Sequence, residues 1–392
     1  MLFVTGIGGC GKTQLMLRFM KEHGSRFIYQ FFIDGSSEDR IRTDLVRNVR
    51  SLGAEHSQKA FEDCILFLSQ PSQNGLSLLL YDNVDEPNLD LSSLLPRGNS
   101  CAIAFTSRNH VLGELDPEAH LPLDIMSMEE ATELLLHGSS LSKVVTDQVR
   151  KDTLVLAEVL GCLPIALQQA CAYMRQTKCS TSAYFSRLSK NKAKLLSQKV
   201  KHQVDMQSIS TYAAFEISFG KLSATSQRLL RLLSCFHWTG FPLDLINQAA
   251  DHGFSDYEEM LVEQGDDFYV GKQCLESIFL CDGEWHATNL DEMIVSLQNY
   301  SMVTLVQGVD TVLVQMHLLA HEWVHACIPK SETHDYECSA IVLLALGARK
   351  ERTASTQYLS GHVLHMASLW NHLHVNHKTA FGFILYENGL YH

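Results

Sequence analysis

The chain has 392 residues, enough for about two or three domains, and its formal net charge is −13. Such an acidic balance argues against non-specific nucleic-acid binding, because phosphate contacts require an excess of basic side chains. Hydrophobic residues make up 46% of the chain, yet no apolar run approaches the roughly 20 residues that cross a bilayer, which excludes a transmembrane helix.

The 11 cysteines include no C-x-x-C pair, and the N-terminus lacks the charged, apolar and small-residue regions of a secretion signal. Scattered cysteines of this kind are typical of a reducing compartment. We therefore expect a cytoplasmic protein.

Residues 1–126 alternate apolar runs with amphipathic stretches, which indicates an α/β fold with a parallel sheet. The expected strands are Leu2–Thr5, Phe27–Ile33, Leu78–Tyr81, Ala102–Thr106 and Leu121–Leu123. This segment is the first predicted domain.

Residues 127–203 form the second predicted domain, which is helical. One helix is expected to end at Gly161 and the next to begin at Pro164, the usual residues for those positions. Residues 187–203 are polar and basic, which fits a solvated helix or linker, or alternatively an arm that contacts DNA. We place a domain boundary at the end of this stretch.

Residues 204–330 are predicted to form a winged-helix domain. Apolar residues at helical spacing are followed by two β-prone runs, Val303–Gln307 and Thr311–Gln315, which predict a hairpin. Residues 331–392 are predicted to be a helical tail. Its last helix, with Tyr386, Gly389 and Tyr391, is spaced like half of a tetratricopeptide-type repeat.

The loop after the first expected strand fits the phosphate-binding pattern G-x-x-x-x-G-K-[ST] in full. Its glycines allow backbone N–H groups to surround a phosphate, and the following helix N-terminus supplies positive potential. Lys12 would add a charge near the terminal phosphates, and Thr13 would offer its hydroxyl to Mg²⁺. The expected nucleotide-binding residues here are Gly6, Gly8, Gly9, Cys10, Gly11, Lys12, Thr13 and Gln14.

Acidic residues follow the third expected strand. Asp82 stands at its carboxyl end, where open α/β sheets bind ligands, and is the second predicted Mg²⁺ ligand. Asp85 and Glu86 are candidate catalytic carboxylates that would orient a water molecule, whereas Asn83 cannot act as a base. The sequence leaves open whether the chain hydrolyses ATP.

Arg108 follows the fourth expected strand and so lies at the same edge of the predicted sheet. A guanidinium there could bind the γ-phosphate and report which nucleotide is present. The alternative is an ordinary surface arginine.

Together these residues resemble the NB-ARC and NACHT signal-transduction ATPases with numerous domains (STAND), which include the fungal NOD-like receptors. Two later segments continue the resemblance over about residues 1–330. Gly161–Leu167 is similar to the family's G-L-P-L-A segment, and Met316–Leu318 is similar to its M-H-D segment, with Leu318 in place of the aspartate.

The resemblance implies a molecular switch with ADP or ATP and Mg²⁺ as ligands. Pro164 would pack on the adenine, and His317 would reach the β-phosphate of ADP. ADP would hold the domains closed, and exchange for ATP would open them. Hydrolysis would be at most slow and would reset the switch, in signalling of the innate-immunity or incompatibility type.

Both ends read as cut, because the family usually has an upstream effector domain and a longer repeat array. We therefore expect a fragment of a longer receptor, whose missing parts would contact protein partners or other copies of the chain. A membrane partner is not expected.

Other functional classes are weighed against the switch. A winged helix could bind DNA as a transcriptional regulator, although the helix around Arg228 and Arg231 is poorly basic. A constitutive ATPase motor would require fast turnover. The segment His321-Glu322-Trp323-Val324-His325 matches the H-E-x-x-H pattern of zinc metalloproteases, but no third ligand is apparent downstream.

Overall fold

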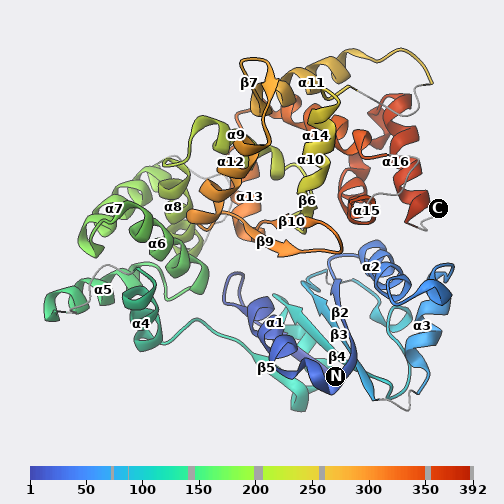
Figure 1. Cartoon of the computed structure of the whole chain (residues 1–392). Coiled ribbons are helices and arrows are strands. Elements are labelled where there is room, and N and C mark those ends of the chain that lie inside the picture. The colour runs from blue at the N-terminus through green and yellow to red at the C-terminus, as the bar shows by residue number, and fades with distance from the viewer. Residues whose placement is uncertain are drawn as a thin grey trace. The chain divides into compact units, whose positions relative to one another are not determined.

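The structure is a computed structural model that describes residues 1–71, 75–86, 88–139, 146–197, 206–255, 261–348 and 355–388. It divides into two compact units, a first built on Met1–Ile125 and a second formed by Met126–Glu387 (Figure 1). Each unit is described in turn.

A five-stranded parallel sheet organises the first unit, in the order β2-β3-β4-β1-β5. The strands are β1 (Leu2–Thr5), β2 (Phe27–Asp34), β3 (Leu76–Asp82), β4 (Cys101–Ser107) and β5 (His120–Pro122). All five predicted strands are therefore present within two residues of their expected bounds. Strand β4 lies between β1 and β3, so the two strands that carry the main motifs are not neighbours.

Helices cover both faces of this sheet because its strands are apolar on both sides. Phe3 and Phe105, whose rings stack 4.9 Å apart, lie in the larger core with residues of α2 (Glu38–Arg50) and α3 (Phe61–Ser69). Val4 faces the opposite side and packs with Met16 of α1 (Lys12–His23). The predicted α/β fold of a P-loop protein is confirmed.

The second unit begins with five helices, of which the first four lie within residues 127–203 and the fifth lies beyond residue 203. They are α4 (Met128–Gly138), α5 (Asp147–Val159), α6 (Pro164–Thr177), α7 (Thr181–Ser197) and α8 (Met206–Phe219). Helix α6 begins at Pro164, as expected. Helix α7 extends to Ser197, so residues 187–197 of the predicted polar and basic linker are helical.

The rest of the second unit combines further helices with a small antiparallel sheet. They are α9 (Ala224–Leu233), α10 (Leu243–Asp251), α11 (Asp266–Phe279), α12 (Ala287–Asn299), α13 (Leu318–Ala326), α14 (Thr333–Leu346), α15 (Thr356–His365) and α16 (Val375–Glu387). The sheet has the order β6-β10-β9, with β6 (Phe241–Pro242), β9 (Thr304–Gln307) and β10 (Val312–Gln315). A separate two-residue pair joins β7 (Leu280–Cys281) to β8 (Glu284–Trp285).

The predicted hairpin is present as β9 and β10. Its turn is closed by Gly308, whose N–H donates to the Thr311 oxygen at 2.8 Å, and Asp310 adopts a positive φ of 53°. The pairing of β6 with β10 was not predicted, because two residues carry no alternating pattern.

The division of the second unit at residues 203 and 330 stays a prediction. Tyr386 lies exposed in α16, whereas Gly389 and Tyr391 of the predicted half-repeat fall outside the described residues. Within the described ranges, no helix combines the length and apolar character needed to cross a bilayer.

The start of the loop after β1 is packed against the chain that follows β5. The Leu123 N–H donates to the Thr5 oxygen at 2.6 Å, and a Cβ on Gly6 would lie 2.1 Å from the Leu123 oxygen. Gly11, in the same loop, has a positive φ of 103° but open space around its Cα hydrogens.

We predict that Gly6→Ala lowers the free energy of unfolding by about 1–3 kcal/mol, because backbone must shift to admit the methyl group. Gly11→Ala is the matched control, since it adds left-handed strain without a clash. Urea denaturation of both variants measures the difference. Equal losses would contradict the packing argument.

Candidate functional site

The loop between β1 and α1 presents backbone N–H groups at a helix N-terminus. Gly9 and Gly11 adopt positive φ values of 82° and 103°, which glycine tolerates, and α1 begins immediately at Lys12. No side chain caps α1, and its first turn contains no acidic residue. The N–H groups of the first turn and the helix dipole are therefore directed at a place that favours an anion.

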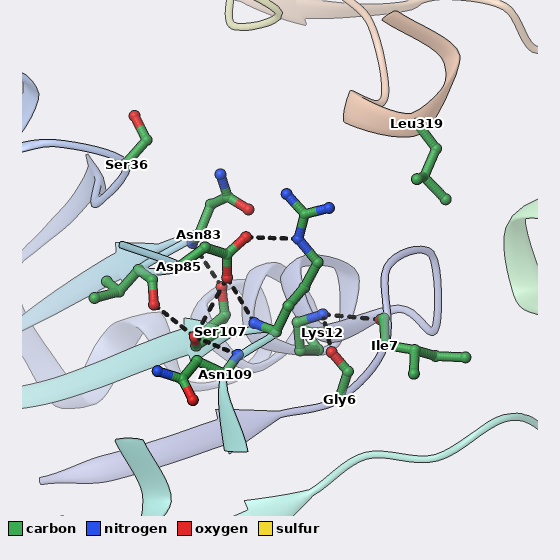
Figure 2. A network of polar contacts seen from close by, with 12 residues as sticks. Gly6, Ile7, Lys12, Ser36, Asn83, Asp85, Ser107, Asn109 and Leu319 are labelled. Carbon is green, nitrogen blue, oxygen red and sulfur yellow. Dashed lines mark hydrogen bonds and ion pairs between the residues drawn. The ribbon is translucent and has the colours of Figure 1, made fainter. Parts of the chain in front are cut away.

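Lys12 is buried and curls back over this loop (Figure 2). Its Nζ donates to the Gly6 oxygen at 2.8 Å and to the Ile7 oxygen at 3.0 Å. Burial lowers the pKa of the Lys12 ammonium. A phosphate at this position would stabilise the charged form, so the predicted role of Lys12 fits its surroundings.

Thr13 and Asp82, the two predicted Mg²⁺ ligands, are in direct contact. The Thr13 hydroxyl donates to Oδ1 of Asp82 at 2.8 Å, and the Thr106 hydroxyl donates to the same oxygen at 2.5 Å. Burial raises the pKa of the Asp82 carboxyl, and the two hydrogen bonds oppose that shift. The Thr13 hydroxyl and the buried Asp82 carboxylate are oxygen ligands of the kind that Mg²⁺ prefers. The charge of a bound Mg²⁺ would offset the cost of burying this carboxylate.

Asp85 and Arg108 form an ion pair at the neighbouring strand ends. Arg108 donates from its backbone N–H to Oδ1 of Asp85 and from Nε to Oδ2, both at 2.6 Å, and the Ser107 hydroxyl lies 3.3 Å from Oδ1. Figure 2 shows Asp85 within this group, beside Ser107 and Asn109. Both oxygens of Asp85 accept hydrogen bonds here, so its predicted role requires this pair to open. Arg108 uses only Nε of its guanidinium in the pair, so the role predicted for Arg108 requires a phosphate to compete with Asp85 for the same charge.

The remaining predicted residues of the loop and strand ends are placed less tightly. Cys10 is buried inside the loop, and Gln14 and Glu86 are exposed. In the part of the chain that the structure describes, no side-chain hydrogen bond or ion pair of Glu86 bears on a catalytic role. Its role as a water-orienting carboxylate stays a prediction.

Two polar residues at this edge were missed by the sequence analysis. The Thr106 hydroxyl donates a hydrogen bond to the Asp82 carboxylate. The sequence feature that could have identified Thr106 is its position next to the last residue of β4, at the carboxyl end of a strand. Asp34 ends β2 directly opposite Asp82 and accepts a hydrogen bond from the Ser36 N–H at 3.0 Å. Asp34 could have been identified as a candidate site residue in the same way as Asp82, because both are acidic residues at the carboxyl end of an apolar strand.

Pro164 and His317 both belong to the second unit. Pro164 is the first residue of α6 and is half-buried. His317 is exposed between β10 and α13, where its Nδ1 accepts a hydrogen bond from the Leu319 N–H at 3.2 Å. These positions are at the beginnings of helices, and the nucleotide contacts expected of both residues stay predictions.

The H-E-x-x-H segment of α13 does not form a metal site. The His321 ring donates from Nε2 to the Phe236 oxygen at 2.7 Å, and the His325 ring donates from Nδ1 to the Ser234 oxygen at 3.1 Å. Both rings therefore satisfy carbonyl groups at and beyond the end of α9. Burial also lowers the pKa of His321. No metal-ligating cluster within the described ranges includes either histidine.

Comparisons with known proteins bear on this resemblance. No family model matches the chain. A nucleotide-binding leucine-rich repeat (NLR)-like protein of Hyaloscypha variabilis is 25% identical over 279 residues, which are 63% of this chain and 28% of that protein. The chain thus spans less than a third of its relative's length. This relative confirms the resemblance to NOD-like STAND NTPases that the ordered motifs indicate.

Two solved structures are similar over most of the chain at 13% sequence identity. A STAND protein with a tetratricopeptide repeat sensor from Pyrococcus horikoshii has a TM-score of 0.49, covering 98% of this chain and 50% of that one. Drosophila ORC bound to DNA has a TM-score of 0.35, covering 83% and 80% respectively.

The buried Asp34 gives the first unit a pH-dependent stability. Burial raises the pKa of Asp34 to about 6 from 3.8, with Arg40 opposing the shift and Asp44 adding to it. A raised pKa means that the folded state holds this proton more tightly. The stabilisation is complete below pH 3.8 and is lost as the pH rises through 6.

We predict that Asp34→Asn stabilises the protein above pH 6 by up to about 3 kcal/mol, because the neutral amide avoids a buried charge. The gain should shrink as the pH falls toward 4. Asp39→Asn, at an exposed position of α2, is the control. Chemical denaturation between pH 4.5 and 8 measures both, and a gain that does not vary with pH would contradict the assignment.

Proposed function

We propose that this chain is an ADP- and ATP-binding switch of the NB-ARC and NACHT signalling class. The observation that carries the proposal is the Thr13–Asp82 hydrogen bond of 2.8 Å beside an uncapped helix N-terminus and the buried Lys12. Backbone N–H groups, an ammonium and an oxygen-donor pair thereby meet at one edge of a parallel sheet. This combination suits a polyphosphate with a divalent cation.

Each group at the sheet edge has a defined part in binding. The loop N–H groups from Gly8 to Thr13 bind phosphate oxygens, and the Lys12 ammonium turns from the Gly6 and Ile7 carbonyls toward the terminal phosphates. Thr13 and Asp82 hold Mg²⁺, which offsets the charge of the phosphates. Arg108 would bind a γ-phosphate in competition with Asp85, which accepts from its Nε.

The switch itself rests on the resemblance. In this proposal Pro164 packs on the adenine and His317 binds the β-phosphate of ADP, so that one ligand links the nucleotide domain, the helical domain and the winged-helix domain. The closed arrangement binds ADP more tightly and the open one binds ATP with Mg²⁺, and this difference in affinity supplies the bias. Leu318 in place of the family's aspartate removes one polar contact from that closed arrangement.

Hydrolysis is proposed to be slow and to reset the switch. A general base needs a carboxylate oxygen that is free to accept a proton from water, and both oxygens of Asp85 already accept hydrogen bonds from Arg108. The opened form would associate with protein partners or other copies of the chain in cytoplasmic signalling. DNA binding is less well supported, because Arg228 donates to Ser277 and Arg231 to Glu332.

We predict that Lys12→Ala weakens ADP binding by about 10–100-fold, since a buried charged hydrogen bond to phosphate is lost. Lys21→Ala removes an exposed ammonium from the same helix and is the matched control. Mass spectrometry of the small molecules released from each purified variant, with calorimetric titration of ADP, measures the effect. ADP retained undiminished by the Lys12 variant would refute the proposal.

A second prediction concerns the second unit. His317→Ala should accelerate ADP dissociation by about tenfold, because one hydrogen bond to the β-phosphate is lost. His286→Ala, at another exposed histidine of this unit, should leave the rate unchanged. Stopped-flow displacement of a fluorescent ADP analogue gives both rates. An unaltered rate in the His317 variant would disprove the interdomain contact while leaving the phosphate-loop assignment intact.

A further inference from the structure

Three side chains with metal-ligating atoms converge between α11 and α14, in the second unit and outside the nucleotide site. Asp267 belongs to α11, and His334 and Cys338 lie one turn apart on α14. Their ligand atoms all lie within 4.8 Å of one another. None of the three takes part in the switch proposed above.

A close approach of the two helices fixes this arrangement. Gly271 of α11 faces Cys338, and a Cβ at Gly271 would lie 2.6 Å from the Cys338 oxygen. The Ser339 hydroxyl donates to the Gly271 oxygen at 3.3 Å across the same contact. Asp267 is one turn before Gly271, just as His334 is one turn before Cys338. The packing therefore places Asp267 beside the histidine and the cysteine.

Two of the three separations match those between ligands on one tetrahedral Zn²⁺ ion, and the third, between Asp267 and Cys338, is within 4.8 Å. Metal distances of about 2.3 Å for sulfur and about 2.0–2.2 Å for nitrogen and oxygen put neighbouring ligand atoms roughly 3.4–3.6 Å apart. Nε2 of His334 is 3.6 Å from the Cys338 sulfur and 3.4 Å from Oδ1 of Asp267. The same nitrogen makes both short contacts, so a single ion can reach all three groups.

We propose that Asp267, His334 and Cys338 bind Zn²⁺, with water as the fourth ligand. Thiolate and imidazole ligands favour Zn²⁺, whereas Mg²⁺ and Ca²⁺ prefer sites made of oxygen. The site links segments that are distant in the sequence. A bound ion would therefore stabilise the packing of α11 against α14.

The charges around the site suit a dication. Burial, with the charges of Asp267, Glu337 and Asp335 adding to it, raises the pKa of the Cys338 thiol to about 12. The negative charges of these carboxylates disfavour a thiolate when no metal is bound, and the same charges attract a cation. When the sulfur–zinc bond forms, the thiol proton passes to solvent, so Zn²⁺ affinity rises with pH. The Asp267 and His334 side chains are 62% and 64% exposed, which gives the ion a path from solvent.

Titration of the untagged full chain with Co²⁺ and Zn²⁺ tests the proposal. Tetrahedral Co²⁺ bound to a thiolate gives near-ultraviolet charge-transfer absorption, and Zn²⁺ should displace it at one equivalent. Cys338→Ser should abolish this band, and Asp267→Asn should weaken binding at least about tenfold. Cys281→Ser, at an exposed cysteine, is the control that should change neither. A band that is absent, or that persists without the Cys338 thiol, overturns the proposal.

Thermal melting supplies a second readout that does not depend on altering the buried thiol. Saturating Zn²⁺ should raise the melting temperature of the native chain by about 5 °C and that of His334→Gln by much less. His286→Ala should respond like the native chain. Equal shifts in all three would mean that His334 and Asp267 form an ordinary ion pair. Neither measurement requires nucleotide, so failure of the zinc site leaves the proposed switch unaffected.

Discussion

The arrangement at the carboxyl edge of the parallel sheet depends on one hydrogen bond, from Thr13 to Asp82. It joins the start of α1 to the end of β3 across the intervening strand β4, between residues that are 69 positions apart. Parallel strands all end at the same edge, so distant motifs can meet there only if the strands keep their order and register. Thr106 of β4 donates to the same carboxylate and ties the middle strand to this contact.

This edge holds more buried charge than the protein itself compensates. Burial raises the pKa of Asp34 and Asp82 and lowers that of Lys12, so the surroundings disfavour the charged form of each. Buried charges without full compensation lower the free energy of unfolding, and they are typical of functional sites. A phosphate near Lys12 would offset the buried ammonium, and a cation near Asp82 would offset the buried carboxylate. Bound together, the two ligands would add little net charge to the site.

Much of this could be predicted from the sequence, because the signals were local. Apolar runs fixed the five strands, and the glycine spacing before Lys12 and Thr13 identified the loop. Contacts between distant segments carried no such signal: the Asp85–Arg108 ion pair, the Thr106 bond to Asp82 and the pairing of β6 with β10 each depend on tertiary packing. The H-E-x-x-H pattern could not be assigned to a structural role from the sequence for the same reason, since the carbonyl groups that accept from His321 and His325 lie 85 and 91 positions away.

Under the proposed function, the ion pair between Asp85 and Arg108 places a carboxylate of the protein in competition with the nucleotide. The Asp85 carboxylate accepts from Nε of Arg108 at 2.6 Å, so a third phosphate group would have to share this guanidinium with Asp85 or displace it. Discrimination between nucleotides would then be an exchange between two anions that compete for one guanidinium, and its net energy would be small although each interaction is strong. With the Arg108 side chain 39% exposed and that of Asp85 21% exposed, dissolved salt weakens both sides of the exchange, and the balance becomes sensitive to small changes nearby.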